Sequence, residues 1–395
     1  MLRIVLKLGA AMIAVWVSAL HSQAATTTAA STAQKDVAAA VALAQDGDTV
    51  QIPAGDSTWR SGLTITKAIT LQGQGVSKTF LRRSAGLLIL QPTNNKPIRV
   101  TGIYFDMSPF AGESSGDRSA IWFYGTCTNL RIDHCYFLNG QRAINIRGYG
   151  YGVTDHCAFH DNNISIYMGI DSDGGNASWA SPVDPGKTDT MVVEDCTIKN
   201  DLPSSAYIDC ELYGQNGARF CFRRNTVDYS ATGVACMPID AHGYNTSWGN
   251  GTRFYEVYNN TFKCQYTYRF AYLRGGAHIF HDNQFITSGG SAPNCIALEL
   301  EKGVKTVPAN QKVVKSFFWN NTYNGSPMGA ADWGLYSGEP VLNVDFFTRP
   351  IQSGDPWYPY TPLVYPHPRV TADGGGKPSS KPSPVEHLRV HASGS

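Results

Sequence analysis

The sequence predicts an all-β protein, a single parallel β-helix in which short strands stack coil upon coil. A short unit ending in Cys or Asn, any residue, and then an apolar or aromatic residue recurs seven times. From Cys135 to Asn283, each unit is followed 12 to 20 residues later by a second strand ending in Gly. No unit contains a helical pattern, so the repeat fits a solenoid of strands. The Cys or Asn takes the same place in every unit, which is called the ladder position here. The seven ladder positions are Cys135, Cys157, Cys196, Asn225, Asn260, Asn283 and Asn321.

The N-terminal elements precede this repeat. Residues 1–24 combine Arg3 and Lys7, an apolar run and a Ser-Gln-Ala ending, which is typical of a secretory signal. Residues 25–34 are rich in Thr, Ala and Ser, and we expect a flexible segment there. Helix formers from Asp36 to Ala44 predict a helix that closes the open end of the solenoid. Thr64–Leu71 alternates with period two and predicts an early repeat unit of the solenoid.

The remaining chain divides into the solenoid and two C-terminal segments. The β-helix domain is expected over residues 35–371, and Gly102 is expected to take a ladder place in an early coil. Residues 355–368 are aromatic and Pro-rich, so they predict an arm outside the sheets, packed on the side or C-terminal end. The Gly/Pro/Ser-rich residues 372–395 predict a disordered tail.

Composition excludes several functional classes. The net charge is +1 and only 16% of residues are charged, which argues against nucleic-acid binding. We expect a secreted or periplasmic protein, free of the membrane once the signal is removed, and a monomer. Nine cysteines are an odd number, and three occupy ladder positions. Stacked, buried free thiols are favoured over disulfides, which remain the alternative.

The chain resembles a known superfamily at both ends and along the ladder. AVALAQDGDTVQIPAG followed by LTITKAITLQGQG resembles the N-terminal cap of right-handed β-helix proteins of the pectin-lyase-like superfamily. The NNTF units resemble its Asn ladder, and YPHP resembles the ending of many exported members. The resemblance implies that the Gly-terminated strands form the first sheet, where enzymes of this superfamily place substrate. Its members include polysaccharide lyases, glycoside hydrolases and adhesins, so it does not select an activity.

The Gly-terminated strands predict the candidate site. Side chains alternate between faces, so the residue before each Gly and the one two earlier should point outward. Stacking then places Glu211, Asp240 and Tyr272 in one column and Tyr213, His242 and Arg274 in the next. An alternative alignment would match Asp209 with Asp240. This patch concentrates groups that transfer protons or bind anions. The expected outward pairs are Trp122/Tyr124, Asn145/Arg147, Glu211/Tyr213, Asp240/His242 and Tyr272/Arg274.

Two reactions fit the patch. For β-elimination on a uronic-acid polymer, which we prefer, Arg274 or Arg147 would bind the sugar carboxylate and His242 or Tyr272 would be the base. For glycoside hydrolysis, Glu211 and Asp240 on neighbouring strands would lie about 5 Å apart. The third hypothesis is a non-catalytic glycan-binding or adhesion protein. The substrate-binding candidates are Asn145, Arg147, Asp209 and the sugar-stacking aromatic residues Trp122, Tyr124, Tyr167, Tyr213 and Trp248.

Two further motifs carry acidic residues. Asp171 and Asp173 lie in a loop whose alternating oxygen ligands suit Ca²⁺, although no cofactor is expected to be required. The pairs Asp133-His134 and Asp155-His156 resemble a metal or acid/base constellation. Because they fall at the ladder turn, away from the Gly-terminated strands, a structural role is favoured for them.

Overall fold

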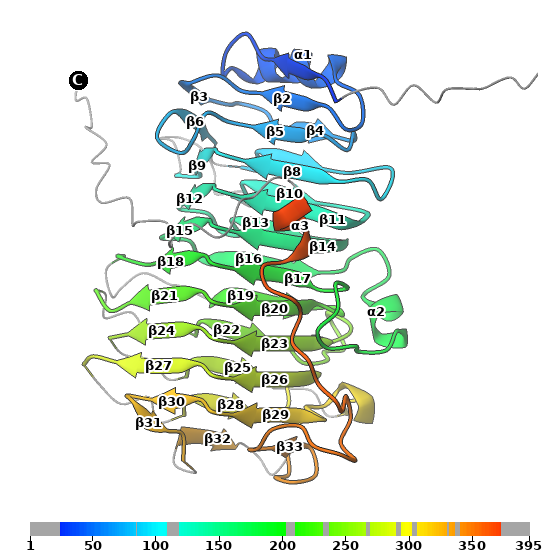
Figure 1. Cartoon of the computed structure of the whole chain (residues 1–395), viewed down its shortest axis with the longest axis vertical. Coiled ribbons are helices and arrows are strands. Elements are labelled where there is room, and N and C mark those ends of the chain that lie inside the picture. Colours follow the sequence, from blue (N-terminus) through cyan, green and yellow to red (C-terminus); the bar gives the residue numbers. More distant parts are fainter. Residues whose placement is uncertain are drawn as a thin grey trace, which may run out of the picture.

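Three parallel sheets form the body of the molecule, as a computed structural model shows (Figure 1). The structure describes residues 24–83, 85–108, 118–202, 210–231, 237–265, 269–289, 294–301, 306–329, 332–335 and 340–372. Each coil contributes one strand to each sheet, and consecutive coils pair in parallel register. The predicted right-handed parallel β-helix is therefore confirmed.

The three sheets are named A, B and C here. Within the described residues, sheet A holds β1 (Thr26–Thr28), β2 (Thr49–Gln51), β5 (Thr70–Gln72), β8 (Ile98–Thr101), β11 (Thr126–Asp133), β14 (Tyr149–Asp155), β17 (Met191–Glu194), β20 (Arg219–Arg223), β23 (Phe254–Tyr258), β26 (Ala277–His281), β29 (Ser316–Trp319) and β33 (Phe346–Phe347). Sheet B holds β3 (Gly55–Thr58), β6 (Thr79–Arg82), β9 (Tyr104–Asp106), β12 (Tyr136–Leu138), β15 (Ala158–His160), β18 (Thr197–Lys199), β21 (Thr226–Tyr229), β24 (Thr261–Cys264), β27 (Gln284–Thr287), β30 (Thr322–Tyr323) and β31 (Ser326–Pro327).

Sheet C contains the Gly-terminated strands, as the sequence predicted. Its described members are β4 (Leu63–Ile65), β7 (Leu88–Leu90), β10 (Ile121–Phe123), β13 (Ile144–Ile146), β16 (Ile164–Gly169), β19 (Cys210–Gln215), β22 (Ile239–Ala241), β25 (Ala271–Leu273), β28 (Ile296–Leu298) and β32 (Trp333–Leu335). Inward residues of the three sheets form one continuous apolar core along the axis. The outer face of sheet C is thereby left to polar and aromatic side chains.

The ladder lies at the corner between sheets A and B. The Asn225 backbone N–H donates to Asn260 Oδ1 over 2.9 Å, and Asn260 Nδ2 donates to the Phe222 carbonyl over 2.8 Å. Cys196 follows the same pattern more weakly, with Sγ 3.7 Å from the Thr154 carbonyl. The residue before each ladder position is left-handed, as at His134 and Asn259. The eight described cysteines are buried free thiols, which confirms that expectation for them, while Cys236 lies outside the described residues.

Two early positions differ from the sequence expectation. Gly102 occupies the left-handed place, with φ of 70°, and Ile103 takes the ladder position instead. The prediction for Gly102 was thus wrong by one residue. Glycine suits the left-handed position that precedes the ladder position, not the ladder position itself. Thr64–Leu71 lies in an early coil, as expected, but its alternation is interrupted where the chain turns a corner at Lys67 and Ala68 between β4 and β5.

A helix covers the N-terminal end of the solenoid, as expected. Helix α1 (Gln34–Leu43) packs Val37, Ala40 and Val41 over the exposed core. Lys67 Nζ donates to the carbonyls of Val41, Ala42 and Ala44, satisfying the end of the helix. Residues 25–34 are not a free linker in this structure, because β1 pairs with β2 and so begins sheet A. Residues 1–23 lie outside the described residues.

The C-terminal arm crosses the outer face of sheet A and ends in α3 (Pro368–Ala372), which confirms a non-sheet arm on the side of the solenoid (Figure 1). Leu363 and Val370 pack on Val153, Val192 and Cys221. Arg223 donates to the Val364 carbonyl over 2.9 Å. The predicted tail beyond Ala372 lies outside the described residues.

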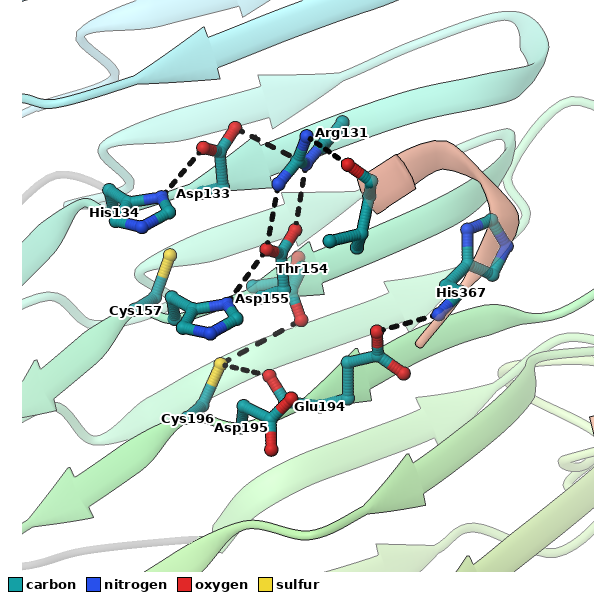
Figure 2. A network of polar contacts seen from close by, with 12 residues as sticks. Arg131, Asp133, His134, Thr154, Asp155, Cys157, Glu194, Asp195, Cys196 and His367 are labelled. Carbon is teal, nitrogen blue, oxygen red and sulfur yellow. Dashed lines mark hydrogen bonds and ion pairs between the residues drawn. The ribbon is translucent and has the colours of Figure 1, made fainter. Parts of the chain in front are cut away.

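Buried charges line the sheet beneath this arm (Figure 2). Arg131 binds both oxygens of Asp155 at 2.9 Å and reaches the Val370 carbonyl at 3.4 Å. Glu194 accepts the His367 backbone N–H over 2.9 Å (Figure 2). His134 and His156 each contact the preceding aspartate at 2.8 and 2.9 Å. These Asp-His pairs therefore join the network that holds the outer face of sheet A, which confirms their structural role.

Two shorter helices lie outside the sheets. Helix α2 (Asn176–Ala180) stands beside sheet A in the long connection after β16 (Figure 1). A 3₁₀ turn spans η1 (Ala309–Gln311). Across the part of the chain that the structure describes, the helices are all too short and too polar to cross a membrane.

Candidate functional site on sheet C

Strand register decides which outward side chains meet on sheet C. Asp240 pairs directly with Tyr213 on one side and with Tyr272 on the other. Glu211 lies two residues before Tyr213, so it is diagonal to Asp240 rather than adjacent. The expected column of Glu211, Asp240 and Tyr272 is therefore wrong, because Tyr213 takes the place beside Asp240. The expected neighbourhood of Tyr213 and His242 is nevertheless confirmed, since their rings lie 4.7 Å apart. The alternative match of Asp209 with Asp240 fails for the same reason as the expected column, and Asp209 itself lies outside the described residues.

The physical reason for this error is Gly214. The count assumed that the glycine ends the strand, yet β19 continues to Gln215 and Gly214 pairs with Ala241 inside the sheet. A Cβ on Gly214 would lie 2.4 Å from the Tyr255 hydroxyl. Gly214 is thus required by the close approach of a tyrosine from sheet A, and it does not mark the corner.

A compact group of charges occupies the outer face of β22 and β25. Arg274 Nη2 donates to both oxygens of Asp240 over 2.7 Å, and Nη1 donates to Glu301 Oε1 over 2.6 Å. Asp240 is 1% exposed, Glu301 6% and Arg274 8%. Burial alone would lower the pKa of Arg274, but Asp240 and Glu301 raise it above its ordinary value. This arginine is therefore the counterion of two carboxyl groups, bound through its two terminal nitrogens.

His242 completes this group, called the charge cluster below: Asp240, His242, Arg274 and Glu301. Nε2 of His242 lies 3.5 Å from Asp240 Oδ2, and Nδ1 lies 3.1 Å from Glu301 Oε2. The second contact is an ion-pair approach rather than an aligned hydrogen bond. Burial raises the pKa of Glu301, but His242, Arg274 and the Gly243 N–H outweigh it and hold that pKa below its usual range. The Glu301 carboxylate is therefore set up to be ionised.

Aromatic rings continue from the charge cluster toward the N-terminal coils. The Tyr213 ring lies 4.7 Å from the His242 ring, and Tyr167 stacks on Tyr213 at 5.1 Å. Trp248, 55% exposed, meets the edge of His242 at 5.5 Å. Trp122 and Tyr124 stack on each other at 5.5 Å and are half-buried. These five residues form an aromatic strip, and they lie on the same face as the cluster.

Arg147 lies within this strip, about three strands from the cluster. Its guanidinium sits 4.4 Å from the centre of the Tyr167 ring and 5.8 Å from that of Trp122. Asn145 Oδ1 accepts its Nε–H over 2.8 Å. Asn145 is fully buried, so it positions Arg147 and is not a surface for substrate as expected. Arg147 keeps 17% of its side chain exposed and can still meet a ligand.

Glu211 forms a second, separate feature on the same face. It alternates with the core residue Leu212 and shares its outward direction with Tyr213. Glu211 is 2% exposed, and the Ser165 hydroxyl of the neighbouring strand donates to it. Burial raises the pKa of Glu211 to about 8 against the effect of that hydrogen bond. At neutral pH Glu211 is thus a neutral carboxylic acid, whereas Asp240 faces a guanidinium.

Tyr272 flanks the cluster without a hydrogen bond to it. Arg274 lies 4.5 Å and Arg269 4.0 Å from the centre of its ring. Its hydroxyl is buried and lacks a hydrogen-bond partner among the described residues. The ring therefore serves as a face for two guanidinium groups, which does not single it out as a base.

The candidate Ca²⁺ loop is occupied by its own contacts. Asp173 accepts hydrogen bonds from the Tyr149 hydroxyl and from the backbone N–H groups of Gly175 and Ala177, close to the start of α2. Asp171 is half-exposed and lies 3.5 Å from Arg147. Among the described residues no group of three or more metal-ligating side chains is arranged to hold an ion. Ca²⁺ binding at Asp171 and Asp173 stays an untested prediction.

Glu301 is the residue that the sequence analysis did not place in the site. It lies three residues beyond β28 and reaches back to Arg274 and to the Gly243 N–H. The alternating acids of LELEKG (298–303) were a visible signal, since Glu299 and Glu301 share one parity. Ser165 carried no comparable signal, because a serine within a strand pattern is common.

Comparisons with known proteins add only distant likenesses. No protein-family model and no curated protein matches this sequence. Three solved structures are similar to it: an alginate lyase from Paenibacillus sp. str. FPU-7 (12% identity, TM-score 0.35, covering 82% of this chain and 98% of that one), a thermostable GH87 α-1,3-glucanase catalytic unit from Streptomyces thermodiastaticus strain HF3-3 (13%, 0.42, 80% and 64%) and a mannuronic acid specific polysaccharide family 6 lyase from human gut microbiota (14%, 0.38, 89% and 93%). Identities and TM-scores this low assign no activity to this chain.

Proposed function

We propose that this protein cleaves a polysaccharide on the outer face of sheet C, and that it does so by hydrolysis. One observation carries the proposal: Glu211, a buried acid whose pKa is raised to about 8, and Asp240, a carboxyl group bound by Arg274, point outward from neighbouring strands. Two carboxyl groups in such different surroundings are suited to be the acid and the base of glycoside hydrolysis.

The corrected register also sets the separation of these two groups. A strand spacing of about 4.8 Å and two residues along the strand place their Cα atoms roughly 8 Å apart. A Cα separation of this size is compatible with carboxyl groups ~6.5–9.5 Å apart, the spacing of inverting enzymes, which leave room for a water molecule. The adjacent placement expected from sequence would have suited the retaining geometry.

The proposed step uses each group once. Glu211 donates its proton to the leaving glycosidic oxygen while the bond from that oxygen to the anomeric carbon breaks. Water attacks the opposite face of this carbon, and Asp240 takes the proton that the water loses. Arg274 holds both oxygens of Asp240 in place and is itself bound by Glu301, while His242 lies against the two carboxyl groups.

The aromatic strip supports a glycan as the substrate. Trp122, Tyr124, Tyr167 and Tyr213 lie on the same face as the two carboxyl groups, and Trp248 stands exposed beside His242. Aromatic rings arranged along the strands of one sheet can stack on the apolar faces of the sugars in a chain. Arg147 could bind an acidic group of such a chain. A non-catalytic glycan-binding protein would need the strip but not the two carboxyl groups in such different surroundings.

β-Elimination, the reaction preferred from the sequence, has less geometric support. Arg274 would have to release Asp240 or Glu301 to bind a sugar carboxylate, leaving a buried charge unpaired. Arg147 lies three strand spacings from His242, roughly 14 Å, too far to serve the same sugar. We therefore keep elimination, with His242 as the base, as the alternative.

Product analysis separates these functions. Purified protein would be incubated with a panel of acidic and neutral polysaccharides, following reducing ends and the ultraviolet absorbance of unsaturated sugars. We expect reducing ends without unsaturated products, and a loss of at least a hundredfold in rate for Glu211→Gln and Asp240→Asn. Asp184→Asn, at an exposed position, is the matched control. Unsaturated products would show elimination, and binding without either product would favour a glycan-binding protein.

Export belongs to the same proposal. We propose that the signal at residues 1–24 is removed after Ala24 and that the mature protein acts outside the cytoplasm as a monomer. N-terminal sequencing of the protein recovered from a natural culture tests the cleavage site, and light scattering tests the monomer. A retained Met1 or a stable dimer would contradict these points.

A further inference from the structure

A pocket lies around the corner from the aromatic strip, between sheet A and α2. It is an open hollow of about 310 Å³, lined by Tyr149, Tyr151, Ala177, Ser178, Ser181, Asp189 and Arg219. Tyr149 follows Arg147 by two residues, so the pocket begins where the chain turns from sheet C to sheet A. None of its residues belongs to the charge cluster.

The sequence Tyr149-Gly150-Tyr151-Gly152 builds one wall of this pocket. Alternation along β14 turns both tyrosines outward and both glycines inward. Gly152 has φ of 139°, and a Cβ there would lie 2.0 Å from the Leu130 carbonyl oxygen. The register with β11 also shifts at this point. Such irregularities re-aim side chains beside binding sites, and here they set two phenol rings 6.4 Å apart at 78°.

Arg219 forms the base of the pocket and has no donor left for a ligand. Nε donates to Ser178 Oγ, Nη1 to the Pro182 carbonyl and Asp189, and Nη2 to the Ser178 and Ser181 carbonyls, at 2.5–3.1 Å. These contacts use all five N–H groups of the guanidinium. They also tie the connection that carries α2 to sheet A, so the pocket is preformed.

Apart from the Tyr151 hydroxyl, the groups left in the pocket are acceptors and rings. Asp189 leaves 42% of its side chain exposed, and Ser181 and Tyr149 already donate their hydroxyl hydrogens to Ala177 and Asp173. A carboxylate on a ligand would be repelled by Asp189, and Arg219 has no N–H group left to bind it. A cation on a ligand would be repelled by Arg219. An uncharged ring with hydroxyl groups avoids both repulsions. Its hydroxyl groups donate to the oxygens of the pocket, and its ring packs against the tyrosines.

We propose that this pocket is an accessory binding site for one neutral sugar unit. Its volume is near the lower limit of ligand pockets, roughly 300 Å³, which suits a single ring rather than a chain. The site is independent of glycan cleavage on sheet C, and it selects an uncharged sugar by the internal pairing of Arg219 with Asp189.

Ala177 allows a test that leaves the fold alone. It is exposed on α2 and lines the pocket, so Ala177→Trp would fill the cavity, whereas Ala180→Trp on the same helix would not. Binding would be measured by ligand-observed NMR with glucose, galactose, mannose, N-acetylglucosamine, glucosamine, glucuronic acid and galacturonic acid, in Asp240→Asn protein to prevent turnover.

The expected result is binding of at least one neutral sugar, at least tenfold weaker in Ala177→Trp and unchanged in Ala180→Trp. Uronic acids and glucosamine should bind at least tenfold more weakly than their neutral counterparts. Absence of neutral-sugar binding, preference for a charged sugar, or equal binding by the two tryptophan variants would overturn the proposal. Because binding rather than cleavage is measured, a failure of hydrolysis at Glu211 and Asp240 would not alter this outcome.

Discussion

Tyr213 lies directly opposite Asp240 on the neighbouring strand of sheet C. This pairing places Glu211 diagonal to Asp240 and brings the Tyr213 ring against His242. It therefore changes the separation of the two carboxyl groups and, with it, the reaction that the site supports best. The following expectations depend on these contacts.

Glu211→Gln should stabilise the protein while abolishing cleavage. Burial raises the pKa of Glu211 from 4.5 to about 8, so between these values the folded state keeps a proton that the unfolded state releases. Stability from this group is present below pH 4.5 and is lost as pH rises toward 8. At pH 7 the variant should gain up to roughly 3 kcal/mol relative to pH 4. Urea unfolding at both pH values measures this, and an equal effect at both would contradict it.

Removing Arg274 should be far more costly than removing Arg147. Arg274→Ala leaves Asp240 and Glu301 buried without their counterion, which should cost about 3–5 kcal/mol in the free energy of unfolding. Arg147→Ala removes a partly exposed guanidinium and should cost about 1 kcal/mol or less. Chemical denaturation of both variants checks the difference. Similar costs would show that the cluster is not a buried ion-pair network.

The asparagine and cysteine positions of the ladder should contribute differently to the free energy of unfolding. Asn260→Ala removes an amide that accepts from the Asn225 N–H and donates to the Phe222 and Tyr258 carbonyls. We expect a loss of at least about 3 kcal/mol, because several buried groups lose their partners. Cys196→Ala removes only weak thiol contacts and should cost about 1 kcal/mol. Thermal unfolding of the two variants compares them, and an equal loss would refute the stronger role of asparagine.

The C-terminal arm should loosen in acid. Burial lowers the pKa of His367 from 6.5 to about 4, so protons bind more readily to the unfolded state between these values. The contribution of His367 is present above pH 6.5 and is lost as pH falls toward 4. Hydrogen exchange of residues 363–372 should therefore accelerate over this interval, and His367→Gln should weaken the pH dependence. Unchanged protection from pH 7 to 4 would contradict this expectation.

Periodic features of the chain were predictable from sequence because they depend on local patterns. The ladder at Asn225 and Asn260, the sheet C strands and the capping helix all follow from side chains that repeat in every coil. The pairs Asp240/His242 and Tyr272/Arg274 were placed correctly because each strand alternates strictly. Gly102 was misread by one residue, since a left-handed turn glycine and a ladder residue are neighbours.

The remaining features depend on contacts between distant segments. Gly214 faces Tyr255 from another sheet, and nothing in the local pattern of β19 reveals that approach. Glu301 reaches Arg274 from beyond its strand, and Arg223 meets the Leu363 carbonyl across 140 residues of sequence. The neutrality of Glu211 results from burial, which composition does not report.

The stereochemistry of the first product tests the central claim most directly. Once a cleaved polysaccharide is identified, proton NMR of the earliest product reads the anomeric configuration before mutarotation. Glu211 as acid and Asp240 as base, with Cα atoms about 8 Å apart, predict inversion at the cleaved bond. Retention of configuration, or cleavage that is unaffected in both Glu211→Gln and Asp240→Asn, would contradict this assignment.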